Sequence, residues 1–208
     1  MCKFKSAIIL KDRVFVPDYD SHTDMLKELG IEDTKANAER LFIRAELYPA
    51  NGDEFSDIDT WEFNVDQDIL PDWYVKEYDK QRMIEAVKEW AKDRIHIGVD
   101  GLDISNGAGH RIKDCKNVFI RGNATVEYIC GSATTVEYIC DSATVKYIRD
   151  SVTVKYICDS ATIVTSPATK WDKLSKANLS GNATIKDCFT KTIYQSGNWT
   201  FKEVKNEE

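Results

Sequence analysis

Cys2 is the first residue of this 208-residue chain whose position could give it chemistry. A small second residue usually allows removal of Met1, which would leave Cys2 with a free α-amine beside its thiol. That amine, with a pKa of about 7.7–8.0, could act as the base that activates the thiol as a nucleophile. The alternative interpretation, which we favour, is that Cys2 is a small residue at the beginning of the first strand.

Carboxylates surround His22 in an alternating pattern, with Asp18, Asp20 and Asp24 at two-residue spacing. In a strand, alternate side chains share one face, so these four residues could hold a divalent metal ion. Ser21, however, is typical of a helix N-cap, and Asp and Ser are common before helices for capping reasons alone. We therefore predict a helix after Ser21 and no metal site, and we keep His22 as a candidate catalytic residue.

A second acidic group consists of Asp66 and Asp68, with Asp72 nearby, and follows a segment over 60–66 that alternates apolar and polar residues. Such carboxylates could work as an acid–base pair or bind Mg²⁺. Pro71 favours a simpler interpretation, in which a strand ends and a turn follows. Asp66 and Asp68 remain candidate binding residues, and we expect neither a metal nor a cofactor.

The elements that must position these residues lie in the first half of the chain. Apolar residues over 7–16 predict a β-hairpin, and residues 41–48 and 60–66 predict two further strands. Apolar residues at helical spacing predict a long helix over 76–95. This order predicts an α+β module over residues 1–98, built from a small antiparallel sheet and one long helix.

Residues 99–208 are organised by a nine-residue repeat, which is most regular from Gly122 onward. The unit has the form [D/G]-[S/N]-A-T-V-[E/K]-Y-I-C, and Thr135 is one extra residue in its second copy. Val, Thr, Tyr and Ile favour a strand, while Asp, Asn, Ser and Gly favour a turn. Self-similarity at a short period predicts an all-β solenoid after the α+β module.

The charged residue before each tyrosine indicates how many copies make one turn of the coil. These residues are Glu127, Glu137, Lys146 and Lys155 in chain order. One copy per turn would stack like charges, whereas two copies place Glu127 beside Lys146 and Glu137 beside Lys155. A three-copy turn would also pair Glu127 with Lys155, but we favour two copies, about 18 residues, per turn.

The repeated tyrosines are candidate binding residues: Tyr128, Tyr138, Tyr147 and Tyr156. Side chains alternate faces along a strand, so Val and Tyr would share the face opposite the Glu/Lys ladder. We therefore favour an internal aromatic stack. An exposed array would instead be a recognition surface, because aromatic residues are enriched in binding hot spots.

Cysteine also recurs at one repeat position, and two copies per turn place Cys140 next to Cys158. Six cysteines in 208 residues are not the density of a secreted disulfide framework, so we expect a buried ladder of reduced thiols. Residues 166–173 predict a bulge or short helix that interrupts the coil. Trp199 and Phe201 are predicted to plug its open end, because an exposed last strand invites edge pairing.

Charge is unevenly distributed between the two halves. Residues 1–105 hold 24 acidic and 14 basic residues, a net charge of −10, and residues 106–208 hold 11 and 14, a net of +3. Because the chain has no basic run, we do not expect direct binding to nucleic acid. We also expect no signal peptide and no membrane span, since no apolar stretch reaches about 18 residues. These features predict a cytoplasmic protein.

Three segments resemble a group of phage and mobile-element proteins of gut bacteria: MCKFKS at residues 1–6, DSH at 20–22 and VDQDILPDW at 65–73. The resemblance covers roughly residues 1–95. It implies a phage or prophage setting, and it implies no particular activity, fold or site residue.

Taken together, these features predict a non-enzymatic interaction protein. Its acidic module could occupy the basic groove of a host defence enzyme or nucleic-acid enzyme, and so inhibit it. One alternative is a Cys2-dependent hydrolase or transferase with the coil as its scaffold. Another is a structural component of a virion. We expect a host protein as partner, and association of copies through the coil is a further structural alternative.

Overall fold

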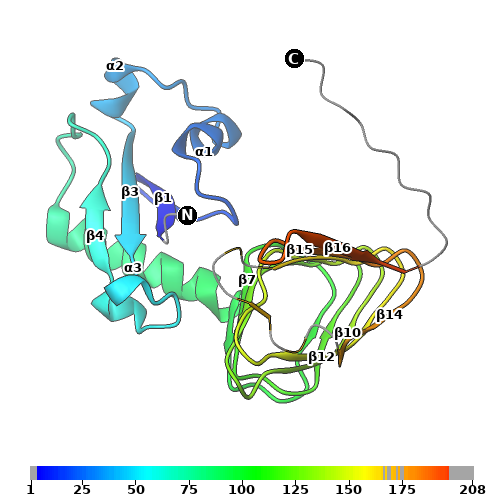
Figure 1. Ribbon diagram of the computed structural model, residues 1–208. Coiled ribbons are helices and arrows are strands. Elements are labelled where there is room, and N and C mark those ends of the chain that lie inside the picture. Colours follow the sequence, from blue (N-terminus) through cyan, green and yellow to red (C-terminus); the bar gives the residue numbers. More distant parts are fainter. Residues whose placement is uncertain (1–3, 166, 168–169, 172, 174–175, 197–208) are drawn as a thin grey trace, which may run out of the picture. The chain divides into compact units, whose positions relative to one another are not determined.

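The computed structural model describes residues 4–165, 167, 170–171, 173 and 176–196 (Figure 1). The chain divides into two compact units, residues 1–95 and 96–208, and the predicted boundary after residue 98 lies a few residues beyond this division. Among the described segments, no helix combines the length and the apolar character that crossing a membrane requires.

A four-stranded antiparallel sheet forms the centre of the first unit, in the order β2-β1-β3-β4. Its strands are β1 (Lys5–Leu10), β2 (Val14–Phe15), β3 (Phe42–Tyr48) and β4 (Glu62–Val65). The two central strands, β1 and β3, are mostly buried along their length. Successive residues of a strand point to opposite faces, so both faces of this sheet must be covered.

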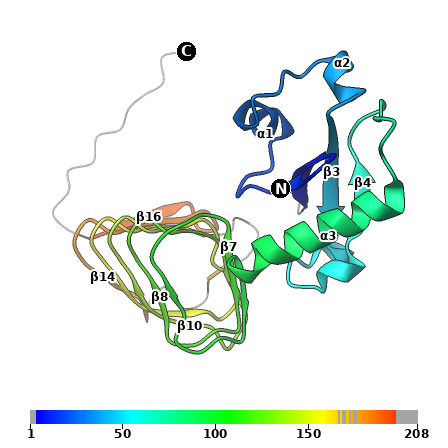
Figure 2. The same cartoon turned by 180° about the vertical axis from the view of Figure 1, so that it is seen from behind.

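Helices cover the two faces of this sheet: α1 (His22–Glu28), α2 (Lys35–Ala38) and α3 (Lys76–Lys92). Figure 2 shows α3 running across one face. Its buried residues pack with alternate sheet residues such as Ala7 and Ile9, while the intervening Ile8 packs with residues of α1 and α2. Two short 3₁₀ helices, η1 (Ala50–Gly52) and η2 (Ile58–Thr60), lie between β3 and β4. The small sheet with one long helix is therefore as predicted.

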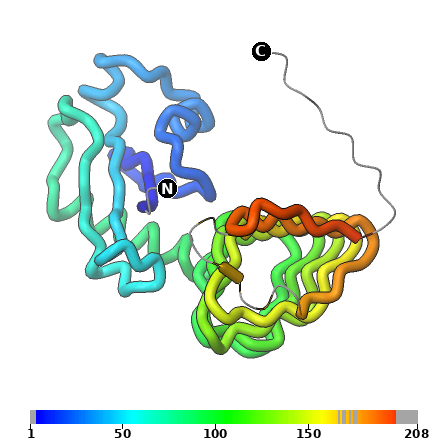
Figure 3. Tube along the Cα trace, in the orientation of Figure 1, coloured from blue at the N-terminus to red at the C-terminus, as the bar shows by residue number. Residues whose placement is uncertain are grey.

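The second unit is a β-solenoid of about five turns, which confirms the predicted fold (Figure 3). Parallel strands stack into two sheets, in the orders β14-β12-β10-β8-β6 and β16-β15-β13-β11-β9-β7-β5. The strands are β5 (Ile95–Ile97), β6 (Asp103–Ile104), β7 (His110–Lys113), β8 (Val118–Ile120), β9 (Thr125–Cys130), β10 (Thr135–Ile139), β11 (Thr144–Val145), β12 (Thr153–Ile157), β13 (Thr162–Val164), β14 (Asn178–Leu179), β15 (Thr184–Asp187) and β16 (Thr192–Gln195). The last strand, β16, is antiparallel to β15.

Strand pairing confirms that two copies of the repeat make one turn. Tyr138 of β10 pairs with Tyr156 of β12, two copies later in the chain. The predicted charge ladder is present as well. The carboxylate of Glu127 lies 2.6 Å from the ammonium of Lys146, and an equivalent pair between Glu137 and Lys155 measures 2.7 Å.

The interior of the coil is aliphatic, so the predicted internal tyrosine stack is wrong. Val126 and Ile129 are fully buried, while Glu127 and Tyr128 between them are not. Two consecutive residues thus point outward, because the strand bends between its Val and Ile positions. Parallel pairing shifts register at this point, between Val136 and Tyr138 of β10. The simple alternation of an unbent strand does not hold there.

Corners of the coil are closed by residues with positive φ, which stack from turn to turn. Gly122, Asp141, Asp159 and Gly181 form one such column, with φ between 57° and 64°. The carboxylate of Asp141 accepts a hydrogen bond of 2.8 Å from the backbone N–H of Gly122, and that of Asp159 accepts one of 3.1 Å from Asp141. Asp tolerates this backbone region better than most residues and caps the neighbouring corner at the same time.

Candidate functional site

An exposed column of aromatic rings runs across strands β8, β10 and β12 of the solenoid. It consists of Phe119, Tyr138 and Tyr156, which are 36%, 42% and 44% exposed. Their rings are stacked, with centroids 6.0 Å apart between Phe119 and Tyr138 and 5.0 Å apart between Tyr138 and Tyr156. We call this set the aromatic column. Because its backbone positions are fixed by ladder hydrogen bonds, the column is a pre-organised surface.

Ion pairs flank the aromatic column. Glu137 and Lys155 lie next to the two tyrosines in sequence, and their side chains are paired with each other. Arg121 follows β8 and binds the carboxylate of Asp103 through two guanidinium nitrogens, at 2.9 and 2.7 Å. This hydrogen bonding holds the pKa of Asp103 below its usual range. The charged neighbours are therefore paired with each other while the rings stay accessible.

The other two repeat tyrosines lie on the opposite sheet and are less accessible. Tyr128 and Tyr147 have ring centroids 5.6 Å apart in a tilted arrangement, and both are half-buried. The guanidinium of Arg149 lies over the Tyr128 ring at 4.8 Å, in a cation–π contact. These two rings are therefore less suited to binding a partner than the aromatic column.

The cysteine ladder is present, but it is only partly buried. Cys130 is buried, whereas Cys140 and Cys158 are half-buried at a corner of the coil. Their thiols and a carboxylate oxygen of Asp159 lie within 4.8 Å of one another. Burial raises the pKa of the Cys158 thiol to about 11, and the charges of Asp159 and Cys140 act in the same direction. These thiols are poor nucleophiles at neutral pH.

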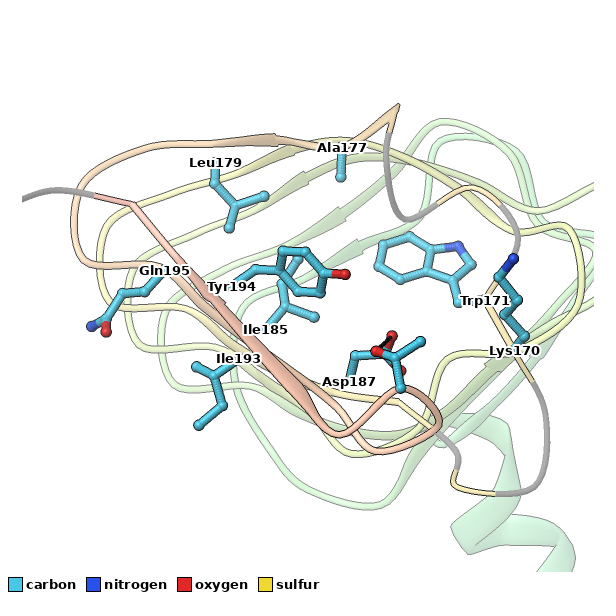
Figure 4. Close-up of a pocket in the computed structure, with 10 residues that line it drawn as sticks. Lys170, Trp171, Ala177, Leu179, Ile185, Asp187, Ile193, Tyr194 and Gln195 are labelled. Atoms are coloured by element: carbon cyan, nitrogen blue, oxygen red, sulfur yellow. Dashed lines mark hydrogen bonds between the residues drawn. The ribbon is translucent and has the colours of Figure 1, made fainter. Parts of the chain in front are cut away.

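A cavity of about 650 Å³ lies at the C-terminal end of the solenoid. Figure 4 shows both apolar side chains, such as Leu179 and Ile185, and polar side chains, such as Lys170 and Gln195, around it. Asp187 also lines it but is occupied by hydrogen bonds from Thr165, Phe189 and Thr190. Burial alone would raise the pKa of Asp187, but these hydrogen bonds outweigh it and lower the pKa.

We interpret this cavity as the unfilled interior of the last turn. Two of its lining residues, Trp171 and Ile185, belong to the solenoid core, and Ala177 and Leu179 pack against this core. The predicted plug residues, Trp199 and Phe201, lie outside the described residues, as does part of the predicted bulge over 166–173.

In the first unit, the structure brings together two residues that the sequence placed in separate groups. The ring nitrogen Nδ1 of His22, at the beginning of α1, lies 3.3 Å from a carboxylate oxygen of Asp66, which follows β4. Glu46 of β3 completes the cluster, and one ligand atom from each residue lies within 4.8 Å of the others. Glu46 was not among the predicted site residues, because its only signal is a charged residue within an apolar strand.

Two of the three carboxylates that neighbour His22 in sequence, those of Asp18 and Asp20, have other partners. Asp18 binds Arg94 and Trp90, Asp20 binds Lys5, and Asp24 donates its backbone N–H to the hydroxyl of Ser21. The helix predicted after Ser21 is therefore present.

The remaining sequence candidates of the first unit do not join this cluster. Asp68 is exposed and lines a different, shallow pocket together with Arg44 and Gln67. Cys2 lies outside the described residues.

Phe119 is the one member of the aromatic column that was missing from the predicted binding residues. The signal for it exists, because Phe119-Ile120 stands nine residues before Tyr128-Ile129 and so occupies the Tyr-Ile position of an earlier, degenerate copy. Comparison of the chain with family models, curated proteins and solved structures found no match.

Proposed function

We propose that this protein is a non-enzymatic interaction protein that binds a host protein through the aromatic column of its solenoid. The observation that carries the proposal is the exposure of three stacked aromatic rings, Phe119, Tyr138 and Tyr156, on one sheet. Aromatic side chains with few rotatable bonds are the commonest anchors of protein interfaces, because they bury a large area at a small entropy cost.

The surroundings of the column suit a protein partner. The Glu137–Lys155 and Asp103–Arg121 pairs provide a polar rim that a partner can meet with hydrogen bonds. The rings lie at the regular spacing of stacked strands, which favours an extended or repetitive surface on the partner. The side chains that form the column are held in place before binding, so little entropy is lost on association.

The first half of the chain adds an electrostatic preference. Its net charge of −10 over residues 1–105 favours a partner with a basic surface, including the groove of a nucleic-acid enzyme. The resemblance of residues 1–95 to phage and mobile-element proteins supports a host protein as the target. Inhibition of a host defence enzyme or nucleic-acid enzyme is the biological role that combines these features.

Affinity capture from a host lysate with the full-length chain tests the proposal. The bait is compared with a double variant, Tyr138→Ala/Tyr156→Ala, and with a control, Tyr78→Ala, which removes a tyrosine of α3 that is more exposed, at 64%, than either of these two. We expect one host protein to be retained by the wild type and by the control, and lost from the double variant. Hot-spot aromatic residues each contribute about 2 kcal/mol or more to binding.

Two results would contradict the proposal. One is capture of the same host protein by the wild type and the double variant with equal affinity, which would move the interface away from the column. The other is loss of binding in Tyr78→Ala as well, which would show a nonspecific dependence on exposed tyrosine. Circular dichroism of each variant checks that the solenoid remains folded, and an activity assay of the captured protein tests inhibition.

A further inference from the structure

We propose that His22, Glu46 and Asp66 form a binding site for a divalent transition-metal ion in the first unit. The three residues come from α1, β3 and the segment after β4, and each offers one ligand atom within 4.8 Å of the others. One imidazole and two carboxylates are a donor set that suits ions such as Mn²⁺, Fe²⁺ and Zn²⁺. The site is independent of the aromatic column and of the function proposed for it.

The hydrogen bond on the far side of the His22 ring is the observation that points to a cation. Ring nitrogen Nε2 lies 3.2 Å from the carbonyl oxygen of Ala45, and a carbonyl can only accept, so Nε2 must carry the hydrogen. In a neutral ring Nδ1 then carries a lone pair. That lone pair faces a carboxylate oxygen of Asp66 at 3.3 Å, and two acceptors at this distance repel each other unless a positive charge lies between them.

The same arrangement is found around histidines that bind metals. A ligating histidine almost always donates its second ring N–H to a backbone carbonyl or a carboxylate, which fixes its tautomer and orientation. His22 has this partner in place, and its side chain is only 10% exposed, so the ring is held in one orientation.

Glu46 supplies the second reason for a cation. It is 9% exposed in the central strand β3, and one of its carboxylate oxygens accepts a hydrogen bond from the hydroxyl of Tyr48. A carboxylate loses hydration when it is buried, and a bound cation compensates for this loss. A divalent ion would neutralise the charges of Glu46 and Asp66 together.

Asp66 provides the route by which an ion reaches the site. Its side chain is 58% exposed, whereas His22 and Glu46 are close to fully buried. The ion would therefore enter from the side of Asp66, and solvent could occupy the coordination positions that face this side. A site with three protein ligands and open positions can also bind a small anionic molecule.

The probe ion must distinguish this cluster from Cys140, Cys158 and Asp159, which also offer three ligand atoms. Thiolates favour soft ions such as Zn²⁺, whereas carboxylates suit Mn²⁺. Mn²⁺ is therefore the ion to titrate into the full-length chain. Binding is measured from the loss of the electron paramagnetic resonance signal of free Mn²⁺.

Ring resonances of the histidines then locate the ion. The chain has three histidines, and the other two, His96 and His110, lie 3.3 Å from each other in the second unit. We expect one equivalent of Mn²⁺ to broaden the ring resonances of His22 selectively. If those resonances remain sharp at saturation, or those of His96 and His110 broaden instead, the proposal is wrong. Sharp His22 resonances would mean that a proton on Nδ1 takes the place of the ion.

The variant Asp66→Asn tests the ligand set without removing a buried side chain, and Asp68→Asn is the matched control. Loss of one ligand is expected to weaken Mn²⁺ binding at least tenfold in Asp66→Asn, while Asp68→Asn keeps the wild-type affinity. Equal affinity in Asp66→Asn and the wild type would overturn the proposal. A second variant, His22→Gln, should abolish the selective site, and its far-UV circular dichroism separates loss of binding from loss of fold.

Discussion

A lysine–carboxylate pair of 2.7 Å occurs in both units, in very different surroundings. In the first unit, the side chain of Lys5 is 2% exposed beside Asp20, whereas in the solenoid that of Lys155 is 50% exposed beside Glu137. Burial, and not distance, decides how much such a pair contributes to stability. The first unit thus depends on contacts made once, while the solenoid distributes its stability over many equivalent contacts.

The largest effect is expected from Asp20→Ala. The substitution leaves the buried ammonium of Lys5 with the Tyr19 carbonyl at 3.1 Å but without its carboxylate. Breaking a fully buried ion pair costs about 3–5 kcal/mol, and because Asp20 is 38% exposed we expect a loss in the lower half of this range. Urea denaturation followed by far-UV circular dichroism measures the change. A loss below about 1 kcal/mol would show that the pair behaves like one at the surface.

A smaller effect is expected from Gly122→Ala in the solenoid. Gly122 has a φ of +61°, and a Cβ added to it would lie 2.2 Å from the carbonyl oxygen of Ser105 in the preceding turn. The control is Gly30→Ala in the first unit, where φ is +67° and no heavy atom lies within 4 Å of the added Cβ.

The control measures backbone strain alone, which is roughly 1–2 kcal/mol. Gly122→Ala adds the displacement of a stacked turn, and we expect a total loss of about 3 kcal/mol. The melting temperatures of the two variants make the comparison. Equal shifts in both would show that the turns of the solenoid can separate at little cost.

Removal of a solenoid ion pair should have a smaller effect still. Lys155→Ala breaks the pair with Glu137, but both groups remain partly hydrated. We expect a loss of about 0.2–1 kcal/mol, reduced further by salt. The measurement is the same urea denaturation at low and high salt. A loss as large as that of Asp20→Ala would remove the distinction between the two units.

The last prediction concerns the rate at which the thiol of Cys158 is alkylated, and it involves the smallest effect on stability. Burial, followed by the charges of Asp159 and Cys140, raises the pKa of its thiol to about 11. An unfolded thiol has a pKa of about 8.5, so alkylation of Cys158 at pH 8.5 should be roughly a hundredfold slower in the folded protein than in urea. The folded-state rate should rise about tenfold per pH unit up to pH 11. Peptide mass spectrometry after iodoacetamide treatment gives the rate, and a half-maximal rate near pH 8.5 would contradict the prediction.

Sequence periodicity was sufficient to predict the solenoid and its two copies per turn. The order Glu, Glu, Lys, Lys before the four tyrosines carries this information, because a turn of two copies places each Glu beside a Lys and stacked neighbours of opposite charge are favourable. The orientation of the tyrosines was not predictable in the same way. An unbent strand would place Val126 and Tyr128 on one face, but the strand bends between them and turns the ring outward. Local bends depend on how the corners of successive turns pack against one another. The sequence of a single copy of the repeat does not determine this packing.

The cluster in the first unit shows a different limit. His22 and Asp66 were each recognised as chemically capable, yet nothing in their spacing places them together. Their contact depends on the antiparallel pairing of β3 with β4 and on the packing of α1 against the sheet. Contacts of this kind are long-range in sequence and occur once, so a pattern-based prediction cannot find them.

Two copies per turn also make the length of the solenoid a modular variable. Duplication of two consecutive copies would insert a whole turn, lengthen each sheet by one strand and extend the aromatic column by one ring. Duplication of a single copy would instead move every later strand to the opposite sheet and bring like charges into register. Recombination between the near-identical copies around Tyr138 and Tyr156 could therefore enlarge or shorten the binding surface in steps of about 18 residues without a new fold.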